Sequence, residues 1–371
     1  MKYYVAVLIG VATVIVPVFT QDLNEDAVNN CTLTGGSLNN LNSIQQRCTS
    51  ITIQDLTVPA GQTLSLTALK AGSTVTFNGL IRFGYAEWTG DLIVVSGTNI
   101  TIIGGSGHLF DCHGERWWDG LGANNGKLKP TLFQTNNLLY SNVRGLRIKN
   151  TPARCFAIQS SQHVVFSNII IDNLDGNSNG GHNTDGFDLN ENNDITIQYS
   201  QIVNQDDCFA INSGTNCYFY HNHCSGGHGI SIGSVGDRRS NVVRNVHVRN
   251  CTVVNSENGI RIKTIANATG QVLDITYEDV TMQNITNYGI VVRGDYRNSG
   301  PTGHPTGGFS IKNLTLSNIQ GWVQRTAINV MVLLAGGVAS EWRWTRVNVT
   351  GSRFAHINNC TGVPPNSGVE C

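Results

Sequence analysis

Charged residues are scarce in this chain. Asp, Glu, Lys and Arg make up 13% of its 371 residues, about half of the share that is usual in soluble domains. The formal net charge of −1 excludes the broad basic surface that attracts nucleic acids or anionic membranes. An acidic ligand must therefore be recognised by a local cluster of bases. Because helix surfaces normally carry Glu, Lys and Arg, their scarcity favours strands and turns.

Long apolar runs are missing too, except at the N-terminus. Val5 to Val18 form an apolar run of 14 residues after Lys2, and a polar stretch begins at Gln21. A membrane span needs about 18 apolar residues, so the run predicts a signal peptide over residues 1–20 and no membrane partner. No linker or break in composition divides the rest, and we expect residues 21–371 to form one domain.

The ten cysteines all follow this N-terminal segment, and their even number suits an oxidising compartment. Asn-x-Ser/Thr acceptors for glycosylation agree with a secreted, extracellular protein. There are eight, at Asn30, Asn99, Asn250, Asn267, Asn284, Asn313, Asn348 and Asn359.

Glycine is abundant, at 41 residues, and Asn, Ser and Thr are plentiful. From about Asn99, short apolar runs alternate with Gly- and Asn-rich turns, with no helical periodicity between them. Recurrent short strands predict stacked coils of a solenoid, a parallel β-helix, rather than a β-sandwich or a propeller. The runs include 99–103, 164–166, 195–197, 218–220, 246–248, 275–277 and 309–311. Residues Ser37 to Cys48 carry apolar residues at helical spacing and predict a short helix that caps the N-terminal end of the solenoid.

Polar motifs recur at the spacing of about one coil between residues 183 and 263. They are Asn183-Thr-Asp185-Gly, Gln-Asp206-Asp207-Cys, Gly-His228-Gly and Arg261-Ile-Lys263. The steps from Asp185 to Asp206 and from Asp206 to His228 are 21 and 22 residues. In a stacked solenoid these side chains form a column, since successive strands lie about 4.8 Å apart. Arg261 and Lys263 lie two positions apart on a strand and point to the same side.

Such a column suits the hydrolysis of a glycosidic bond. That reaction needs one carboxyl group to protonate the leaving oxygen and another to activate water or attack the sugar. Crowded carboxylates repel one another, so at least one pKa is raised and that group holds a proton. Each motif taken singly is also an ordinary turn. A metal site formed by Asp185, Asp206, Asp207 and His228 is the alternative chemistry, and Arg261 with Lys263 could instead neutralise the acids.

Taken together and in this order, the motifs resemble the polygalacturonase family, glycoside hydrolase family 28. Trp117-Trp-Asp-Gly120, Gly226 to Gly236, and Tyr288 to Tyr296 followed by Pro301-Thr-Gly-His-Pro-Thr-Gly add to the resemblance. It implies a right-handed parallel β-helix that hydrolyses α-1,4-linked galacturonic acid in polygalacturonic acid or pectin. The reaction inverts the anomeric configuration and uses no metal or cofactor.

The resemblance also implies roles for single residues. Asp206 is expected to be the general acid, Asp185 and Asp207 to activate the attacking water, and His228 to tune the acid. Arg261 and Lys263 are expected to grip a galacturonate carboxylate, and Asn183 and Tyr296 to position the sugar. Arg293 stands where many relatives carry a neutral amide, so an extra base facing the substrate is expected there.

Cysteine pairings follow from the resemblance as well. It implies Cys31–Cys48, Cys208–Cys224 and Cys360–Cys371. The other four match no family pairing, and Cys112–Cys155 with Cys217–Cys251 is the remaining expectation.

Other functions stay open at this point. A pectate lyase is also β-helical but needs Ca²⁺ and an Arg or Lys base. A non-catalytic pectin-binding protein and a rhamnogalacturonan hydrolase are further alternatives, the latter disfavoured by Arg261 with Lys263. We expect a monomeric, endo-acting hydrolase with no nucleic-acid partner.

Overall fold

The computed structural model describes residues 31–122, 125–354 and 360–371. The predicted signal peptide and the acceptors Asn30 and Asn359 lie outside the described residues. Within these ranges no helix has the length and hydropathy that a membrane span requires.

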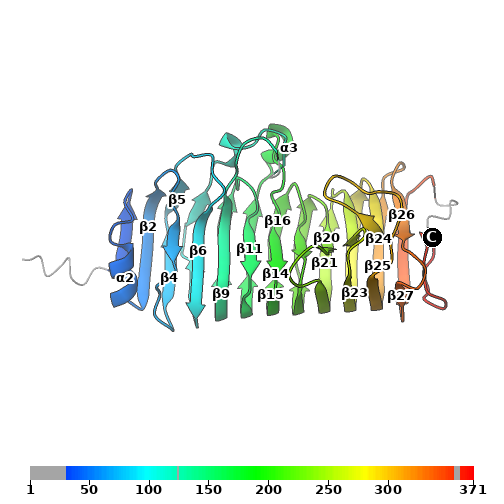
Figure 1. Ribbon diagram of the computed structural model, residues 1–371. Helices are drawn as coiled ribbons and strands as arrows, with labels where there is room; N and C mark the ends of the chain where they lie inside the picture. The colour runs from blue at the N-terminus through cyan, green and yellow to red at the C-terminus, as the bar shows by residue number, and fades with distance from the viewer. Residues whose placement is uncertain (1–30, 123–124, 355–359) are drawn as a thin grey trace, which may run out of the picture. The chain divides into compact units, whose positions relative to one another are not determined.

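Cys31–Cys371 form one compact body, a right-handed parallel β-helix in which one 29-stranded sheet winds through successive coils. In Figure 1 the strands stand side by side along the stack, with α2 at its N-terminal end. Every pairing between the described strands is parallel, and the strands within the stack pair with one strand in the coil before and one in the coil after. Two packed antiparallel sheets, as a sandwich requires, are therefore excluded.

The sheet has three faces. The site face carries the functional motifs and consists of β3 (Leu64–Leu66), β6 (Asp91–Thr98), the start of β9 (Thr131–Arg144), β11 (Phe156–Gln159), β14 (Phe187–Asn190), β17 (Phe209–Ile211), β20 (Ile230–Val235), β22 (Asn258–Ile265), β24 (Tyr288–Tyr296), β26 (Ile328–Leu333) and β29 (Cys360–Thr361).

The second face contains most of the apolar runs that the sequence reveals. It consists of β1 (Thr32–Gly35), β2 (Ser50–Val58), β4 (Thr74–Asn78), β7 (Thr101–Gly104), the end of β9, β12 (Gln162–Ser167), β15 (Asn192–Gln198), β18 (Gly214–Tyr220), β21 (Val242–Val254), β23 (Gly270–Ile285), β25 (Phe309–Val323), β27 (Ala339–Ser340) and β28 (Arg343–Thr350).

The third face consists mostly of short strands. Its strands are β5 (Leu80–Phe83), β8 (Leu109–Asp111), β10 (Arg147–Lys149), β13 (Ile170–Asp172), β16 (Gln201–Asn204), β19 (His223–Gly226) and the later parts of the long strands β21, β23 and β25. The loops before the site face carry a 3₁₀ turn, Gly114–Arg116, and α3 (Gly176–Asn179).

Identical or similar side chains stack inside the coils. On the site face Phe133, Phe156, Phe187 and Phe209 occupy one register position, and all four are fully buried. The ring centroids of Phe156 and Phe187 lie 5.0 Å apart with nearly parallel planes. Such aromatic pairs add to the stabilisation that burial alone gives. This ladder fixes the register of the strands that carry the site.

Asparagine is plentiful because it forms the corners. Asn216, Asn245 and Asn318 have φ between 53° and 56°, a left-handed conformation that Asn tolerates better than most residues. Their amides also link coils: Asn245 Nδ2 donates to Asn216 Oδ1 at 2.6 Å, and Asn318 Nδ2 donates to Asp279 Oδ1 at 2.7 Å.

The predicted N-terminal helix is α2, Leu41–Arg47. Leu41 and Ile44 are buried in the end of the core, and Gln45 donates to the carbonyl of Ser65 at 2.9 Å. The Cys31–Cys48 disulfide joins the first strand to the end of this helix. The helix therefore covers the first coil as expected.

The disulfides Cys208–Cys224 and Cys360–Cys371 are also present, but the expected pairs Cys112–Cys155 and Cys217–Cys251 are wrong. All four of these cysteines are buried free thiols. Cys217 stands in register with Val246, not with Cys251, and the backbone of Cys112 pairs with Lys149 instead. Burial raises the pKa of the Cys217 and Cys251 thiols to about 12, so both stay protonated.

Candidate active site

Three successive turns bring the acidic residues together at the start of the site-face strands. Asp185 precedes β14, Asp206 and Asp207 precede β17, and His228 precedes β20. The turns are joined through their backbones, since Gly186 N–H donates to the Asp207 carbonyl at 2.9 Å and His228 N–H donates to that of Asp206 at 2.8 Å. The column that the 21- and 22-residue spacing predicts is thus present.

Two glycines permit this close stacking. A Cβ on Gly186 would lie 2.5 Å from the Cys208 carbonyl oxygen, and one on Gly227, whose φ is +48°, would lie 2.2 Å from that of Asp206. A larger residue at either position would push the turns apart. Asn204, fully buried, donates its amide to the carbonyls of Asp206 and Asp207 at 2.9 and 3.0 Å and holds the catalytic turn rigid.

The Asp206 carboxylate accepts hydrogen bonds from three sides. Asn183 Nδ2 donates to Oδ2 at 2.8 Å, and the N–H of Asp207 donates to Oδ1 at 2.7 Å. His228 Nδ1 lies 3.0 Å from the same Oδ1. This side chain is therefore held in one orientation, with 7% of the residue exposed.

Arg261 and Lys263 both reach Asp207. Arg261 Nη2 donates to Asp207 Oδ1, and Lys263 Nζ donates to Oδ2 at 2.9 Å. Ser231 Oγ adds a bond to Oδ1 at 2.6 Å. The two bases do point to one side of β22, as expected from their spacing, but in the unliganded site they neutralise a buried carboxylate rather than stand unpaired.

Burial and nearby charges shift the pKa values of Asp185 and Asp206 in opposite directions. Burial and the charges of Asp206 and Asp188 raise the pKa of Asp185 well above its usual range. Burial alone would raise the pKa of Asp206 too, but the charges of His228, Lys263 and Arg261 outweigh it and hold that pKa below the usual range. A proton is therefore held more readily by Asp185 than by Asp206.

The pKa values of Asp207 and His228 also depend on a balance between burial and neighbouring charges. Burial opposes ionisation of Asp207, but Arg261 and Lys263 lower its pKa. Burial would lower the pKa of His228, and its contact with Asp206 raises it instead. His228 is thus a cation beside the Asp206 carboxylate.

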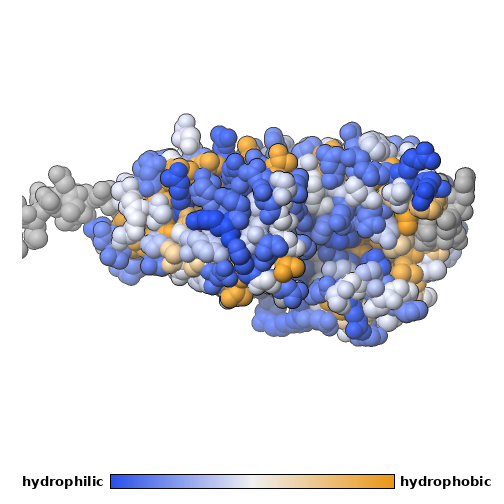
Figure 2. All heavy atoms as spheres, turned by 90° about the horizontal axis from the view of Figure 1, so that it is seen from above, coloured by the Kyte–Doolittle hydropathy of each residue, from blue (hydrophilic) through white to orange (hydrophobic). Residues whose placement is uncertain are grey.

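Four adjoining cavities form a groove along the site face. The central cavity, about 200 Å³, contains all three acids and Lys263. The outer cavity toward the N-terminal coils, about 200 Å³, shares Arg154, Asp188, Asn212 and Arg238 with it. A cavity of about 470 Å³ shares Asn183, Asp206, Lys263 and Tyr296 with the central one. It meets a fourth, about 520 Å³, at Gly120 and His228. Figure 2 shows a largely hydrophilic face with a hollow near its middle.

The remaining predicted residues fall on this groove with one exception. Tyr296 lines two of the cavities, and Lys263 Nζ lies 5.2 Å from the centre of its ring. Arg293, expected as an extra base facing the substrate, is instead bound to the fully buried Asp295 through two bonds of 2.7 and 3.0 Å.

Sequence reasoning missed Asp188, Arg154 and Arg238. Asp188 Oδ2 pairs with Arg154 Nε at 3.1 Å, and Asn212 Nδ2 donates to Oδ1 at 2.5 Å. Asp188 shares a register position with Ala210, Ser231 and Arg261. Aligning the coils on Phe187 and Phe209 would have placed it on the row of Arg261.

Known proteins share this arrangement over most of the chain. The model of glycosyl hydrolases family 28 matches residues 48–371. A polygalacturonase of Cochliobolus carbonum is 49% identical, with 93% of each chain covered. The chain belongs to glycosyl hydrolase family 28.

Other relatives of this glycoside hydrolase agree. Endopolygalacturonase 1 of Colletotrichum lindemuthianum is 48% identical over 87% of this chain and 88% of its own. Among solved structures, endopolygalacturonase I from Stereum purpureum complexed with two galacturonate has a TM-score of 0.78 and 35% identity. The alignment covers 86% of this chain and 95% of that one.

The metal alternative depends on Asp206, Asp207 and His228, whose ligand atoms all lie within 4.8 Å of one another. The donor set does not fit a cation. His228 Nδ1 already lies 3.0 Å from Asp206 Oδ1, and both oxygens of Asp207 are already bound to cationic side chains. A cation would have to displace these contacts before it could bind.

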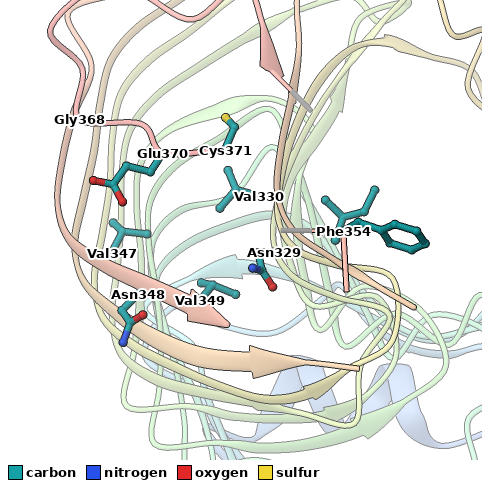
Figure 3. Close-up of a pocket in the computed structure, with 10 residues that line it drawn as sticks. Asn329, Val330, Val347, Asn348, Val349, Phe354, Gly368, Glu370 and Cys371 are labelled. Atoms are coloured by element: carbon teal, nitrogen blue, oxygen red, sulfur yellow. The ribbon is translucent and has the colours of Figure 1, made fainter. Parts of the chain in front are cut away.

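A separate cavity of about 220 Å³ lies between β26, β28 and the C-terminal tail. Figure 3 shows Val330, Val347 and Val349 around it, with Glu370 at one side. Among the described residues that line it, Glu370 carries the single ionisable acid. The described lining of this cavity therefore lacks the pair of acidic side chains that glycosidic hydrolysis requires.

Proposed function

We propose that the protein is a secreted, monomeric endopolygalacturonase that hydrolyses α-1,4-galacturonosyl linkages in polygalacturonic acid and pectin. The observation that carries this proposal is a buried group of three carboxyls in a groove beside two cations, where the pKa of Asp185 is raised and that of Asp206 is lowered. The names of the relatives support the same substrate. The groove runs along several coils, which suits binding in the middle of a polymer and so endo action.

Recognition of the substrate falls to four residues in this proposal. Lys263 and Arg261 bind a galacturonate carboxylate next to the scissile bond, because charged hydrogen bonds to carboxylates are strong and directional. Tyr296 and Asn183 position the sugar from the wall of the groove. The bound carboxylate partly offsets the positive charge that lowers the pKa of Asp206 in the unliganded site.

The reaction then follows from the movement of one proton. As the cationic field on Asp206 weakens, the proton passes from Asp185 to Asp206. Asp206 donates it to the glycosidic oxygen as that bond breaks, and water attacks the anomeric carbon from the other face. Asp185, now ionised, takes the proton of the attacking water with the help of Asp207. Asp185 ends protonated and Asp206 ionised, as in the unliganded site.

The decisive experiment is to analyse the products on polygalacturonic acid. We expect saturated oligogalacturonides of mixed length early in the reaction, an inverted anomeric configuration by NMR, and the same rate with a chelator. Unsaturated products that absorb ultraviolet light, or activity lost with chelator, would instead indicate a Ca²⁺-dependent lyase. Release of single galacturonate units from the start would contradict endo action. N-terminal sequencing of secreted protein tests cleavage after about Thr20, and gel filtration tests the monomer.

A further inference from the structure

The loop 236–241 carries two consecutive arginines in different surroundings. It connects β20 on the site face with β21 on the second face. Arg239 forms an ion pair with Glu191. Arg238 lines both the central and the outer cavity, and no bond to its guanidinium is found among the described residues. Arg239 is thus held by an ion pair, whereas Arg238 lines the groove.

The Glu191–Arg239 pair clamps the loop to a turn two coils away. Arg239 Nε donates to Oε1 at 2.7 Å and Nη2 donates to Oε2 at 2.5 Å, a two-bond geometry that fixes orientation. Glu191 is itself held, because its N–H donates to Ser213 Oγ at 2.9 Å and Gln159 Nε2 donates to its Oε2 at 3.3 Å. Its side chain is 14% exposed. Glu191 is therefore a rigid anchor that does not itself line these cavities.

The loop has a second attachment at its other end. The N–H of Arg238 donates to Asn241 Oδ1 at 3.0 Å, and Asn241 Nδ2 donates to the carbonyl of Thr269 at 3.1 Å. With both ends held, the direction of the Arg238 side chain depends on the pair between Glu191 and Arg239.

The outer cavity has the charge that a carboxylate requires. Its other ionisable residues, Arg154 and Asp188, pair with each other at 3.1 Å and largely cancel. Arg238 adds one positive charge to this lining, and with Arg154 it opposes the burial that raises the pKa of Asp188. Gln134, Gln159 and Asn190 supply neutral amides around it, which suit sugar hydroxyls. This cavity therefore favours a sugar ring that carries one carboxylate.

We infer that Arg238 binds the carboxylate of a second galacturonate residue, in the outer cavity, and that Glu191 and Arg239 are positioning residues that hold it there. This inference rests on the proposed function, because it takes the polymer to run through the groove. The clamp sets the affinity for long substrates and leaves the chemical step to Asp185, Asp206 and Asp207.

A double-mutant cycle tests the clamp. Glu191→Gln, Arg239→Gln and the double variant are compared with wild type on oligogalacturonides of increasing length. Each single variant should raise KM for long substrates about tenfold, the scale of one charged hydrogen bond, with kcat within about twofold. The double variant should be no worse than either single one. The reversed pair Glu191→Arg with Arg239→Glu should recover most of the affinity.

A direct variant and a matched control complete the design. Arg238→Gln should raise KM for long substrates at least as much as the clamp variants, and should raise it less for the shortest substrate that is cleaved. Glu278→Gln removes a comparable surface pair, Arg249 Nε with Glu278 Oε2 at 3.4 Å on the second face, and should change neither constant. Unchanged KM in Arg238→Gln, or strictly additive clamp variants, would overturn the inference. A wild type inactive on polygalacturonate would overturn the proposed function instead.

Discussion

At the scale of single residues, the site depends on which carboxyl holds the proton. Asp185 and Asp206 line the same cavity, yet the cations near Asp206 and the burial of Asp185 drive their pKa values in opposite directions. Acid and base roles require two carboxyls with separated pKa values, but this separation is the reverse of the proposed roles, so Asp206 must gain a proton and Asp185 must lose one before the bond breaks.

Asp206→Asn should reduce kcat on polygalacturonic acid by about 10²- to 10⁴-fold, because an amide cannot donate the proton that general acid catalysis supplies. Its oxygen can still accept from Asp207 N–H, so we expect a folded protein with near-normal substrate binding. Circular dichroism and binding of an oligogalacturonide provide the control. Activity within tenfold of wild type would remove Asp206 from the role of acid.

Asp185 gives the stability of the protein a definite pH dependence. Its folded pKa lies well above the ordinary value of 3.8, so its protonated form is favoured in the fold and its contribution is lost as pH rises through the folded pKa. The pKa of His228 is raised above 6.5. Its contribution to stability is therefore also lost as pH rises, but at a higher pH. One such group changes the free energy of unfolding by up to about 1.4 kcal/mol per pH unit. We expect the melting temperature to fall between mildly acidic and neutral pH, and Asp185→Asn to flatten that fall. Parallel curves for the two proteins would contradict this.

Lys263→Ala tests the two roles of the basic pair. The variant should affect stability as well as activity, because Lys263 Nζ pairs with a buried Asp207. Loss of one partner of a buried pair costs several kcal/mol at most, about 3–5, and Arg261 and Ser231 remain to limit it. We expect a lower melting temperature and at least a tenfold lower rate on polygalacturonic acid.

Methyl-esterified pectin separates these two effects. It lacks the carboxylate, so the variant and wild type should differ less on it. An equal loss on both polymers would assign Lys263 to structure alone.

Much of the cluster was predictable from sequence, since its spacing equals one coil. The partner of Arg261 and Lys263 was not. The step from His228 to Arg261 is 33 residues, longer than one turn-to-turn step. Which of the three acids contacts Arg261 and Lys263 therefore depends on how the backbone turns at Gly227, and the spacing in the sequence does not reveal this.

At the scale of elements, the Cys208–Cys224 disulfide fastens the catalytic turn. It joins the residue after Asp207 to β19 on the next coil. We expect Cys208→Ser with Cys224→Ser to lower the free energy of unfolding by roughly 3 kcal/mol, as for a closed loop of about 15 residues, and to lower kcat.

The terminal disulfide is the matched control for that variant. Cys360→Ser with Cys371→Ser removes a bond far along the chain from the acids and should leave kcat unchanged. Equal kinetic losses in both variants would show that the bond near Asp207 has no special role.

The elements themselves were predicted unevenly. Most of the repeated apolar runs lie on the second face, where strands such as β12, β15 and β18 alternate buried and half-buried residues. The short strands of the third face, three residues long in β8, β10 and β13, leave too little pattern to be recognised. The four remaining cysteines were mispaired because sequence spacing does not reveal register.

At the scale of the whole molecule, α2 protects an open end of the sheet. Replacing Leu41 and Ile44 with Asp should displace the helix and expose the edge of the first coil. We expect concentration-dependent association by light scattering, while Leu174→Asp, at a position 58% exposed, should behave as wild type. A monomeric double variant would show that the helix is dispensable.

The parallel stack has a consequence for how the chain acquires its structure. Each strand pairs with its neighbours in adjacent coils, and the three disulfides close loops of only 17, 16 and 11 residues. A coil can therefore dock as soon as it leaves the ribosome, with the previous coil as its template. The acidic cluster is complete once residues up to Lys263 have emerged, so a chain interrupted after the following coil would already carry an assembled active site.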